Sequence, residues 1–406
     1  MVELKDLKNR NPRAWTLLLT QNTETTDIIV AAVGEEPLPA TKDVSRFLLS
    51  LAGYHEPFSL IGKRTNPVEA LFYEAFAPQF PHFTPTCWFS HVGVEDGWLV
   101  LTDVQNDHPP EHWTGNDVDI LIGNLASLHA AFWGKREVLA QYGLPDFLGE
   151  AEAEAASIPG EGGDEQRSEQ LPDQMARIER WLQGQRRHLT EHAKRTAGPL
   201  TPLLAEASDG LYVLRQVDGW PGIVDEQHLA ALADLLDDPL PMLYPLRQLP
   251  STLLHGDPSA KRWCLTLFDD YYLLDWQKTA IGPGVYDLLT FIDQMELLAD
   301  ERRSRVNEET MIDSYILAMR GELGTRFDAR ATRQAIPAAR CLHVLGRWLP
   351  FLGESLQQLR HDDNTWPTME DLSDEELIEA GLTQLPKLRT SLATVFDRFL
   401  RDYRSL

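Results

Sequence analysis

The chain has 406 residues, of which 43% are hydrophobic, so it is long enough for two domains or for one enzyme whose two lobes share a cleft. It carries 62 acidic residues against 37 Lys and Arg, and its formal net charge is -25. Such a surface repels phosphate backbones and anionic lipid heads, so we expect neither nucleic acid nor a membrane as a partner. A solvated acidic surface explains this charge more simply than a cationic substrate does.

The three cysteines, Cys87, Cys264 and Cys341, lie far apart and show no CxxC spacing. This pattern predicts buried thiols in a reducing cytoplasm and no zinc site. The first fifteen residues contain no apolar segment of the secretory type, and no window approaches 18 consecutive apolar residues. We therefore expect a soluble, cytoplasmic protein.

The first hundred residues are rich in short strand patterns. β-Branched or alternating stretches, separated by Gly, Pro and acidic residues, predict a meander followed by a further strand. These stretches lie at 27–34, 44–53, 58–64 and 97–104. Between the third and fourth, residues 67–78 carry apolar side chains at helical spacing, and Pro67 suits the first position of a helix.

From about residue 106 onwards, helical patterns dominate, beginning with residues 117–134. We therefore expect an α+β chain with a strand-rich lobe over 1–105 and a mainly helical lobe over 106–406. The acidic, aliphatic-poor stretch at 150–170 predicts a mobile loop. Ser373 with Glu376 has the spacing of a capping box and predicts a helix start.

A hairpin is predicted where the strand-like runs 263–268 and 271–276 are separated by two aspartates. A two-residue turn fixes the register and sets Arg262 opposite Gln277, one diagonal step from Asp275. The start of the first run and the end of the second run then lie side by side.

This hairpin brings Asp257 and Asp275 to the same end, although they are 18 positions apart in sequence. Two converging carboxylates serve phosphoryl transfer: one orients the attacking hydroxyl and accepts its proton, and the other holds Mg²⁺ on the nucleotide phosphates. The hairpin alone also allows a plainer interpretation, in which Asp257 caps a turn and Asp275 is an ordinary carboxylate at a strand end.

Three motifs taken together, LLHGD at 253–257, LLDWQ at 273–277 and GPGVYDL at 282–288, resemble the aminoglycoside phosphotransferase and choline kinase-like family. This family is a branch of the protein-kinase-like fold. LASLHAAFWG at 125–134 is similar to the family's helix before the catalytic loop, and GWLVLTDV at 97–104 to its hinge strand.

The resemblance covers most of residues 27–300, and the DWQ form is similar to members near the ecdysteroid kinase-like group. It implies a protein-kinase-like two-lobe fold with a nucleotide-binding N-terminal lobe. In the C-terminal lobe it implies a catalytic loop at 253–262, a metal-site hairpin at 263–277 and the acceptor site.

The resemblance also implies roles for single residues of the second half. Asp257 corresponds to the catalytic aspartate and His255 to the residue that braces the catalytic loop. Asp275 corresponds to the aspartate that binds Mg²⁺. Asp287 corresponds to a residue that hydrogen-bonds the catalytic loop from a helix start, where an aspartate is favourable in any case.

In the first half, Lys63 corresponds to the lysine that contacts the α and β phosphates of ATP. Glu69 is the expected partner of this lysine, with Glu74 as the alternative, because Glu69 stands shortly before the apolar pair at 71–72. The hinge would offer backbone groups to the adenine edge. Its residues are Leu101, Thr102, Asp103 and Val104.

Two departures from the family pattern bear on activity. The segment 34–43, between the first two strands, has a single glycine and two glutamates where phosphates would lie. Five residues after Asp257, Arg262 stands where the family has a metal-binding asparagine, and a guanidinium cannot coordinate a cation.

Arg262 leaves two alternatives open. It contacts the phosphates and replaces the charge of one Mg²⁺, or it pairs with Asp275 and competes for the carboxylate that the metal needs. A cation beside that carboxylate attracts it by roughly 4 kcal/mol at an intermediate dielectric. If nothing compensates this attraction, it weakens Mg²⁺ binding by about three orders of magnitude.

Our leading hypothesis is an ATP-dependent O-phosphotransferase that acts on the hydroxyl of a small molecule. One alternative is a catalytically impaired kinase-fold protein that binds a nucleotide or a metabolite. A metal-dependent hydrolase using His255, Asp257 and Asp275 is a weaker third hypothesis, because no second histidine stands at ligand spacing. The sequence does not identify the acceptor.

Overall fold

A computed structural model of the protein describes residues 2–23, 25, 27–38, 43–149, 188–266, 268, 270–297, 307–361 and 365–406. The mobile loop predicted at 150–170 lies outside these ranges. The described residues form two compact units, and each unit is discontinuous in sequence. The first combines residues up to 128 with 254–280, and the second comprises the described parts of 129–253, 281–299 and 308–406.

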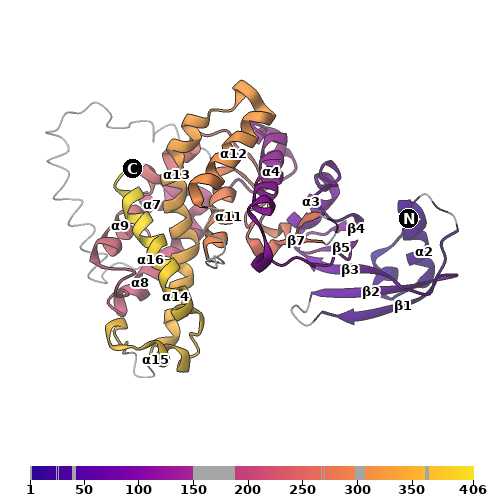
Figure 1. The fold of residues 1–406 in the computed structure, drawn as a ribbon, viewed down its shortest axis with the longest axis horizontal. Helices are drawn as coiled ribbons and strands as arrows, with labels where there is room; N and C mark the ends of the chain where they lie inside the picture. The colour runs from indigo at the N-terminus through magenta and orange to yellow at the C-terminus, as the bar shows by residue number, and fades with distance from the viewer. Residues whose placement is uncertain are drawn as a thin grey trace. The chain divides into compact units, whose positions relative to one another are not determined.

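The first unit is built on an antiparallel sheet with the strand order β1-β2-β3-β5-β4 (Figure 1). Its strands are β1 (Val30–Pro37), β2 (Val44–Leu51), β3 (Phe58–Thr65), β4 (Cys87–Val92) and β5 (Gly97–Thr102). The central strand β3 pairs with β2 on one side and β5 on the other, so Lys63 lies between Val44 and Leu99. Because both neighbours of β3 are hydrogen-bonded to it, the backbone of Lys63 has a fixed position.

Two helices at the start of the chain, α1 (Leu4–Lys8) and α2 (Pro12–Thr23), supply a hydrophobic layer for the sheet. One face of α2 is apolar at helical spacing and is buried among side chains of β2, β3 and β5. This cluster includes Trp15, Leu18, Leu19, Phe47, Leu60, Trp98 and Val100. Trp15 is the largest anchor, with its ring centroid 4.9 Å from that of Phe47.

Helix α3 (Pro67–Ala75) follows β3 directly, where the sequence predicts it. The side chain of Asn66 caps the helix by accepting a hydrogen bond from the backbone N–H of Glu69, and Pro67 occupies the first turn. This cap fixes Glu69 in the first turn, close to the end of β3.

The later part of the first unit, residues 254–280, holds the loop and the hairpin that carry Asp257, Arg262 and Asp275. Short strand β6 (Thr252–Leu254) leads into it and β9 (Ala280–Gly282) follows it. Its own elements are the 3-10 turns η5 (Ala260–Arg262) and η6 (Trp276–Lys278) and the hairpin strands β7 (Trp263–Leu265) and β8 (Tyr271–Leu273).

The predicted register of this hairpin is wrong. Leu265 pairs with Tyr271, and the backbone N–H of Thr266 donates to the carbonyl of Asp270 at 3.0 Å, so the connection is longer than two residues. The hydroxyl of Thr266 explains the difference, because it accepts hydrogen bonds from the backbone N–H groups of Phe268 and Asp270 and closes a wider turn. Arg262 consequently lies opposite Leu274, the residue before Asp275, and not opposite Gln277.

The second unit is mainly helical in its described residues. Helix α4 (Gly115–Ala131) leads into it from the first unit. The further α-helices are α5 (Arg136–Gln141), α7 (Glu191–Ala197), α8 (Thr201–Gln216), α9 (Glu226–Asp237), α10 (Leu240–Arg247), α11 (Val285–Leu297), α12 (Glu308–Leu323), α13 (Ala329–His343), α14 (Leu349–Leu356), α15 (Asp374–Glu379) and α16 (Gln384–Tyr403). A π-helical turn at Val344–Trp348 joins α13 to α14.

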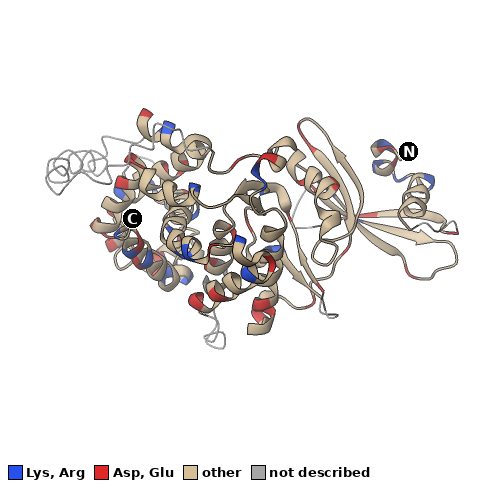
Figure 2. Cartoon of the chain, turned by 90° about the horizontal axis from the view of Figure 1, so that it is seen from above, with Lys and Arg blue, Asp and Glu red and all other residues tan. Residues whose placement is uncertain are grey.

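Acidic and basic residues are interspersed along the helices of the second unit (Figure 2). Several of them form exposed ion pairs, such as Lys194 with Glu191 at 2.7 Å. Such pairs contribute little to stability and keep the surface solvated. No helix within the described ranges is long and apolar enough to cross a membrane.

The expected α+β architecture, with a strand-rich N-terminal part and a helical C-terminal part, is confirmed. The capping box of Ser373 and Glu376 is also present and opens α15. The sequence analysis did not predict α1, α2 or β4. The expected division into lobes near residue 105 stays a prediction.

Gly62 provides a test of the sheet packing beside Lys63. A Cβ atom at Gly62 would lie 2.3 Å from Cε2 of Phe47 and 3.2 Å from Trp98. We expect Gly62→Ala to lower the free energy of unfolding by about 1–3 kcal/mol, measured by urea denaturation. The control is Gly34→Ala in β1, where the nearest atom is an ordinary 3.6 Å away. Equal stability of the two variants would contradict the packing.

Candidate functional site

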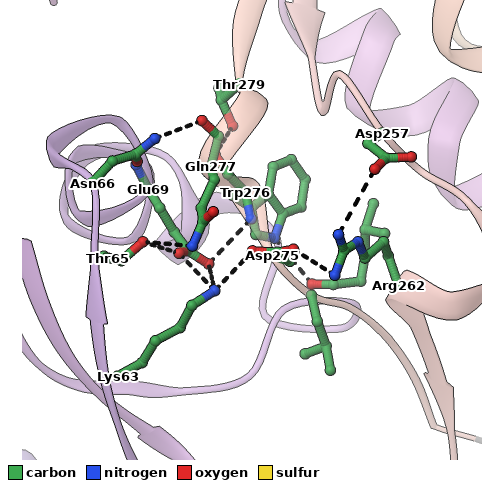
Figure 3. A network of polar contacts seen from close by, with 12 residues as sticks. Lys63, Thr65, Asn66, Glu69, Asp257, Arg262, Asp275, Trp276, Gln277 and Thr279 are labelled. Atoms are coloured by element: carbon green, nitrogen blue, oxygen red, sulfur yellow. Dashed lines mark hydrogen bonds and ion pairs between the residues drawn. The ribbon is translucent and has the colours of Figure 1, made fainter. Parts of the chain in front are cut away.

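Lys63 connects two carboxylates that come from different parts of the first unit (Figure 3). Its Nζ lies 2.9 Å from Oε1 of Glu69 on α3 and 2.8 Å from Oδ1 of Asp275 after β8. The side chain of Lys63 is only 15% exposed. The two carboxylates neutralise the charge of this largely buried ammonium group. The contact also holds the end of β3 against the segment that follows β8.

Glu69 is fully buried and satisfies its carboxylate within this network. Besides Lys63, it accepts a hydrogen bond from the hydroxyl of Thr65 and one from the backbone N–H of Trp276 at 3.1 Å. Such a set of donors is what a buried carboxylate requires. Glu74, the alternative partner considered for Lys63, is exposed on the same helix.

Asp275 has a left-handed backbone conformation, with φ 69° and ψ 64°. For an aspartate this conformation costs energy, and it persists where the surroundings determine it. Here Trp276 is fully buried and its ring stacks on Phe72 of α3 at 3.6 Å. The carbonyl of Gln277 accepts a hydrogen bond from Asn66 at 2.8 Å. These contacts to α3 hold the backbone on which Asp275 stands.

His255 braces the loop that carries Asp257. It is fully buried, its Nε2–H donates to the carbonyl of Leu274 at 3.1 Å, and its Nδ1 accepts from the backbone N–H of Asp257 at 3.2 Å. The two bonds define the tautomer with the proton on Nε2. Its ring also packs against Trp276 with centroids 4.5 Å apart. His255 therefore positions the loop and ties it to the hairpin.

Gly256 permits the close approach of this loop to the residues after Asp275. It has φ 84°, and a Cβ atom there would lie 2.2 Å from the carbonyl oxygen of Lys278. Only glycine combines a positive φ with the space that this contact leaves. The glycine of the HGD motif thus has a structural reason in this chain.

Arg262 lies between Asp257 and Asp275 (Figure 3). Its Nη1 is 2.5 Å from Oδ2 of Asp275, and its Nη2 is 3.8 Å from Oδ2 of Asp257. Lys278 also approaches Asp257, with Nζ 3.5 Å from Oδ2. The expected proximity of Arg262 and Asp275 is therefore present, although the hairpin register that predicted it is wrong.

The electrostatics of Asp275 follow from these neighbours. Burial acts to raise the pKa of its carboxyl group, but the charges of Lys63 and Arg262 and the hydrogen bond from Lys63 outweigh burial, so the pKa is lowered from its ordinary value of 3.8. Asp275 is therefore ionised at neutral pH. Each of its oxygens faces a cation: Oδ1 faces Lys63 and Oδ2 faces Arg262.

The four hinge residues lie at and beyond the end of β5. Leu101 is buried in the sheet, and Thr102 donates its backbone N–H to Thr86 and accepts a hydrogen bond from the indole of Trp88. The other two, Asp103 and Val104, continue the chain beyond the strand.

The side chain of Asp103 anchors the hinge. It accepts hydrogen bonds from Nε of Arg46 at 2.6 Å and from the hydroxyl of Ser59 at 2.5 Å, on β2 and β3 respectively. The expected use of these hinge backbone groups by an adenine ring stays a prediction.

Asp287 lies in the first turn of α11 in the second unit, fully buried. There it faces His129, with Oδ2 3.4 Å from Nε2, while Nδ1 of His129 lies 2.8 Å from the hydroxyl of Tyr315. Its expected hydrogen bond to the catalytic loop stays a prediction.

Three members of the site were not identified from the sequence. Thr65 and Trp276 belong to the Glu69 network, and Lys278 approaches Asp257. A signal existed for Trp276 and Lys278, because both lie within three residues of Asp275. Thr65 gives no such signal, since a threonine at a strand end is common. Among the described residues, no group of three or more His, Cys, Asp or Glu side chains could hold a metal ion.

Comparisons with known proteins give a likeness in fold. No protein-family model matches the chain, and no curated protein matches its sequence. Among solved structures, the chain is similar to an aminoglycoside phosphotransferase from Alicyclobacillus acidocaldarius, at 12% identity and a TM-score of 0.39, with 92% of each chain covered.

Two further similar structures are the choline kinase LicA from Streptococcus pneumoniae and a spectinomycin phosphotransferase in complex with ADP and spectinomycin. The first has 12% identity and a TM-score of 0.36, and covers 92% of this chain and 98% of its own. The second has 11% identity and a TM-score of 0.42, and covers 91% and 94%.

The buried carboxylate of Glu69 can be tested by truncation. We expect Glu69→Ala to lower the free energy of unfolding by about 3–5 kcal/mol, because it leaves Lys63 without this partner and the N–H of Trp276 without an acceptor. Urea denaturation of the purified variant measures the loss. The control Glu74→Ala, on the exposed face of α3, should change stability by less than about 0.5 kcal/mol. A similar effect of both variants would refute the network.

The ion pairs of Asp275 predict a pH-dependent contribution to stability. A lowered carboxyl pKa stabilises the fold above the ordinary value, and this contribution is lost as the pH falls through the folded-state pKa. We expect the stability difference between the wild type and Asp275→Asn to be constant from about pH 7 to 5 and to shrink below about pH 4. Denaturant unfolding over this range measures it. A difference independent of pH would argue against ionised Asp275.

Proposed function

We propose that the chain transfers the terminal phosphoryl group of ATP to the hydroxyl group of a small molecule. The observation that carries this proposal is the convergence of Lys63, Glu69, Asp275 and Asp257 in the first unit, where Arg262 joins the two aspartates. Phosphoryl transfer needs positioning and positive charge around the phosphates together with a carboxylate for the acceptor, and this group supplies both.

Asp257 is the candidate for the acceptor side of the reaction. Its loop is fixed by His255 and Gly256, and its carboxylate is 12% exposed, so it is held in place and still reachable. In the reaction the acceptor oxygen bonds to the γ-phosphorus, and the bond from that phosphorus to the bridging oxygen breaks. ADP leaves, and Asp257 accepts the proton of the hydroxyl.

The donor phosphates are assigned to the cations on the other side of the site. Lys63 is held by Glu69 and Asp275, which orients its ammonium at the end of β3. The hinge, Leu101 to Val104, begins in the last residues of β5 and continues beyond the strand. It is the candidate for binding the adenine. The ion pair of Asp103 with Arg46 keeps the hinge attached to β2.

Mg²⁺ does not fit the residues around Asp275 as they stand. Both carboxylate oxygens face cations, and Arg262 has donors only, where a metal would need an oxygen ligand. The roles proposed here for Lys63, Asp257 and the hinge depend on no metal ion.

The proposed function is tested by measuring phosphoryl transfer from ATP to an acceptor. Purified protein is incubated with ATP and a panel of amino sugars, amino alcohols, sugars and sterol-like alcohols, and phosphorylated product is detected by ³¹P NMR. We expect turnover with at least one class, and a loss of about 10²- to 10⁴-fold in kcat for Asp257→Asn with unchanged ATP affinity.

The matched control is Asp270→Asn, an exposed carboxylate of the same hairpin, which should keep full activity. Turnover that persists unchanged in Asp257→Asn would refute the assigned role. Absence of ATP binding in the folded wild type would refute the function itself.

A further inference from the structure

Arg262 fills the space between the two carboxylates of the site. One end of its guanidinium lies 2.5 Å from Asp275 and the other 3.8 Å from Asp257. A guanidinium there supplies positive charge beside both aspartates in a fixed planar geometry. The other oxygen of Asp275 is held by Lys63 at 2.8 Å.

The charges of the cluster balance without a metal ion. Its three carboxylates are Glu69, Asp257 and Asp275, and its three cations are Lys63, Arg262 and Lys278. If Arg262 were a neutral residue, the carboxylates would exceed the cations by one. A polyphosphate would then meet a net negative site and would need a metal ion to bind.

The exposed cations are available to a ligand. The side chains of Arg262 and Lys278 are 39% and 66% exposed, whereas that of Lys63 is 15% exposed. A guanidinium has five N–H donors, so Arg262 can hold Asp275 and still donate to a phosphate oxygen. Lys278 is flexible enough to turn from Asp257 towards the same ligand.

We propose that Arg262 takes the place of the divalent cation, so that Arg262, Lys63 and Lys278 bind the phosphates of the nucleotide directly and without Mg²⁺. This inference rests on the proposed function, since it concerns the donor site of that reaction. It assigns to Arg262 a binding role that distinguishes this chain from a site with a metal-binding asparagine.

The test is the binding of ATP measured by titration calorimetry, in EDTA and in excess MgCl₂. We expect the wild type to bind ATP in EDTA with an affinity within about threefold of that in MgCl₂. In Arg262→Asn, the affinity in EDTA should fall by about 10- to 100-fold, the range of a lost charge-assisted hydrogen bond, and MgCl₂ should restore part of it.

Two matched variants complete the design. Arg64→Asn removes an exposed arginine from β3, where it pairs with Asp96, and should leave ATP affinity unchanged in both buffers. Lys278→Met should lower the affinity in EDTA by about tenfold and keep the phosphate contact of Arg262. Thermal unfolding confirms that each variant is folded, and if Arg262→Asn is not, Arg262→Lys and Lys278→Met carry the test.

The outcomes separate this inference from the proposed function. Wild-type binding that is at least tenfold tighter in MgCl₂ would overturn the role of Arg262, while the function would stand. Equal affinity of Arg262→Asn and wild type in EDTA would overturn it as well. Failure of the wild type to bind ATP in either buffer would instead remove the proposed function.

Discussion

The ammonium group of Lys63 is the contact on which the rest of the site depends. It joins Glu69 on α3 to Asp275, which lies 212 positions after Lys63 in the chain. A buried carboxylate such as Glu69 is stable only if its charge is compensated and its oxygens are hydrogen-bonded. Lys63, Thr65 and the N–H of Trp276 together meet this requirement, so the sheet, the helix and the segment after β8 stabilise one another.

The neighbours of this contact are fixed by packing more than by charge. Trp276 stacks on Phe72 and lies against the ring of His255, so α3, the hairpin and the loop of His255 share one buried aromatic group. Because Asp275 directly precedes Trp276, the same packing holds Asp275 in its left-handed conformation. The hydrogen bonds of His255 then link Leu274 to Asp257. Uncharged packing and hydrogen bonds thus hold the backbone that carries Asp257 and Asp275.

Arg262 changes the chemistry that this framework can support. A site with two aspartates and one lysine has an excess of negative charge and depends on a metal ion to accept phosphates. With Arg262 between the aspartates and Lys278 beside Asp257, the three carboxylates and three cations of this cluster balance in charge. The same guanidinium lowers the pKa of Asp275, in addition to the larger effect of Lys63, and removes the oxygen ligands that a metal needs. Substitution of one residue therefore alters which cation serves the phosphates.

The sequence by itself determined most of the strands, helix α3 and several of the residues that meet at the site. Alternating and β-branched stretches predicted four of the five strands, and the apolar spacing after Pro67 predicted α3, because these signals are local. β4 was missed because CWFSHV has no alternation of apolar and polar residues. The motifs likewise singled out Lys63, Glu69, Asp257, Arg262 and Asp275 before any contact between them was known.

Tertiary structure alone decided how these residues meet. The predicted two-residue hairpin turn was wrong, because Leu265 pairs with Tyr271 and the hydroxyl of Thr266 accepts the backbone N–H groups of Phe268 and Asp270 in a wider connection. The sequence left Glu74 open as an alternative to Glu69, and in the structure Lys63 pairs with Glu69 while Glu74 is exposed on α3. The position of Arg262 between two carboxylates, finally, is a result of long-range pairing, because electrostatic interactions depend on distances in space that sequence separation does not give.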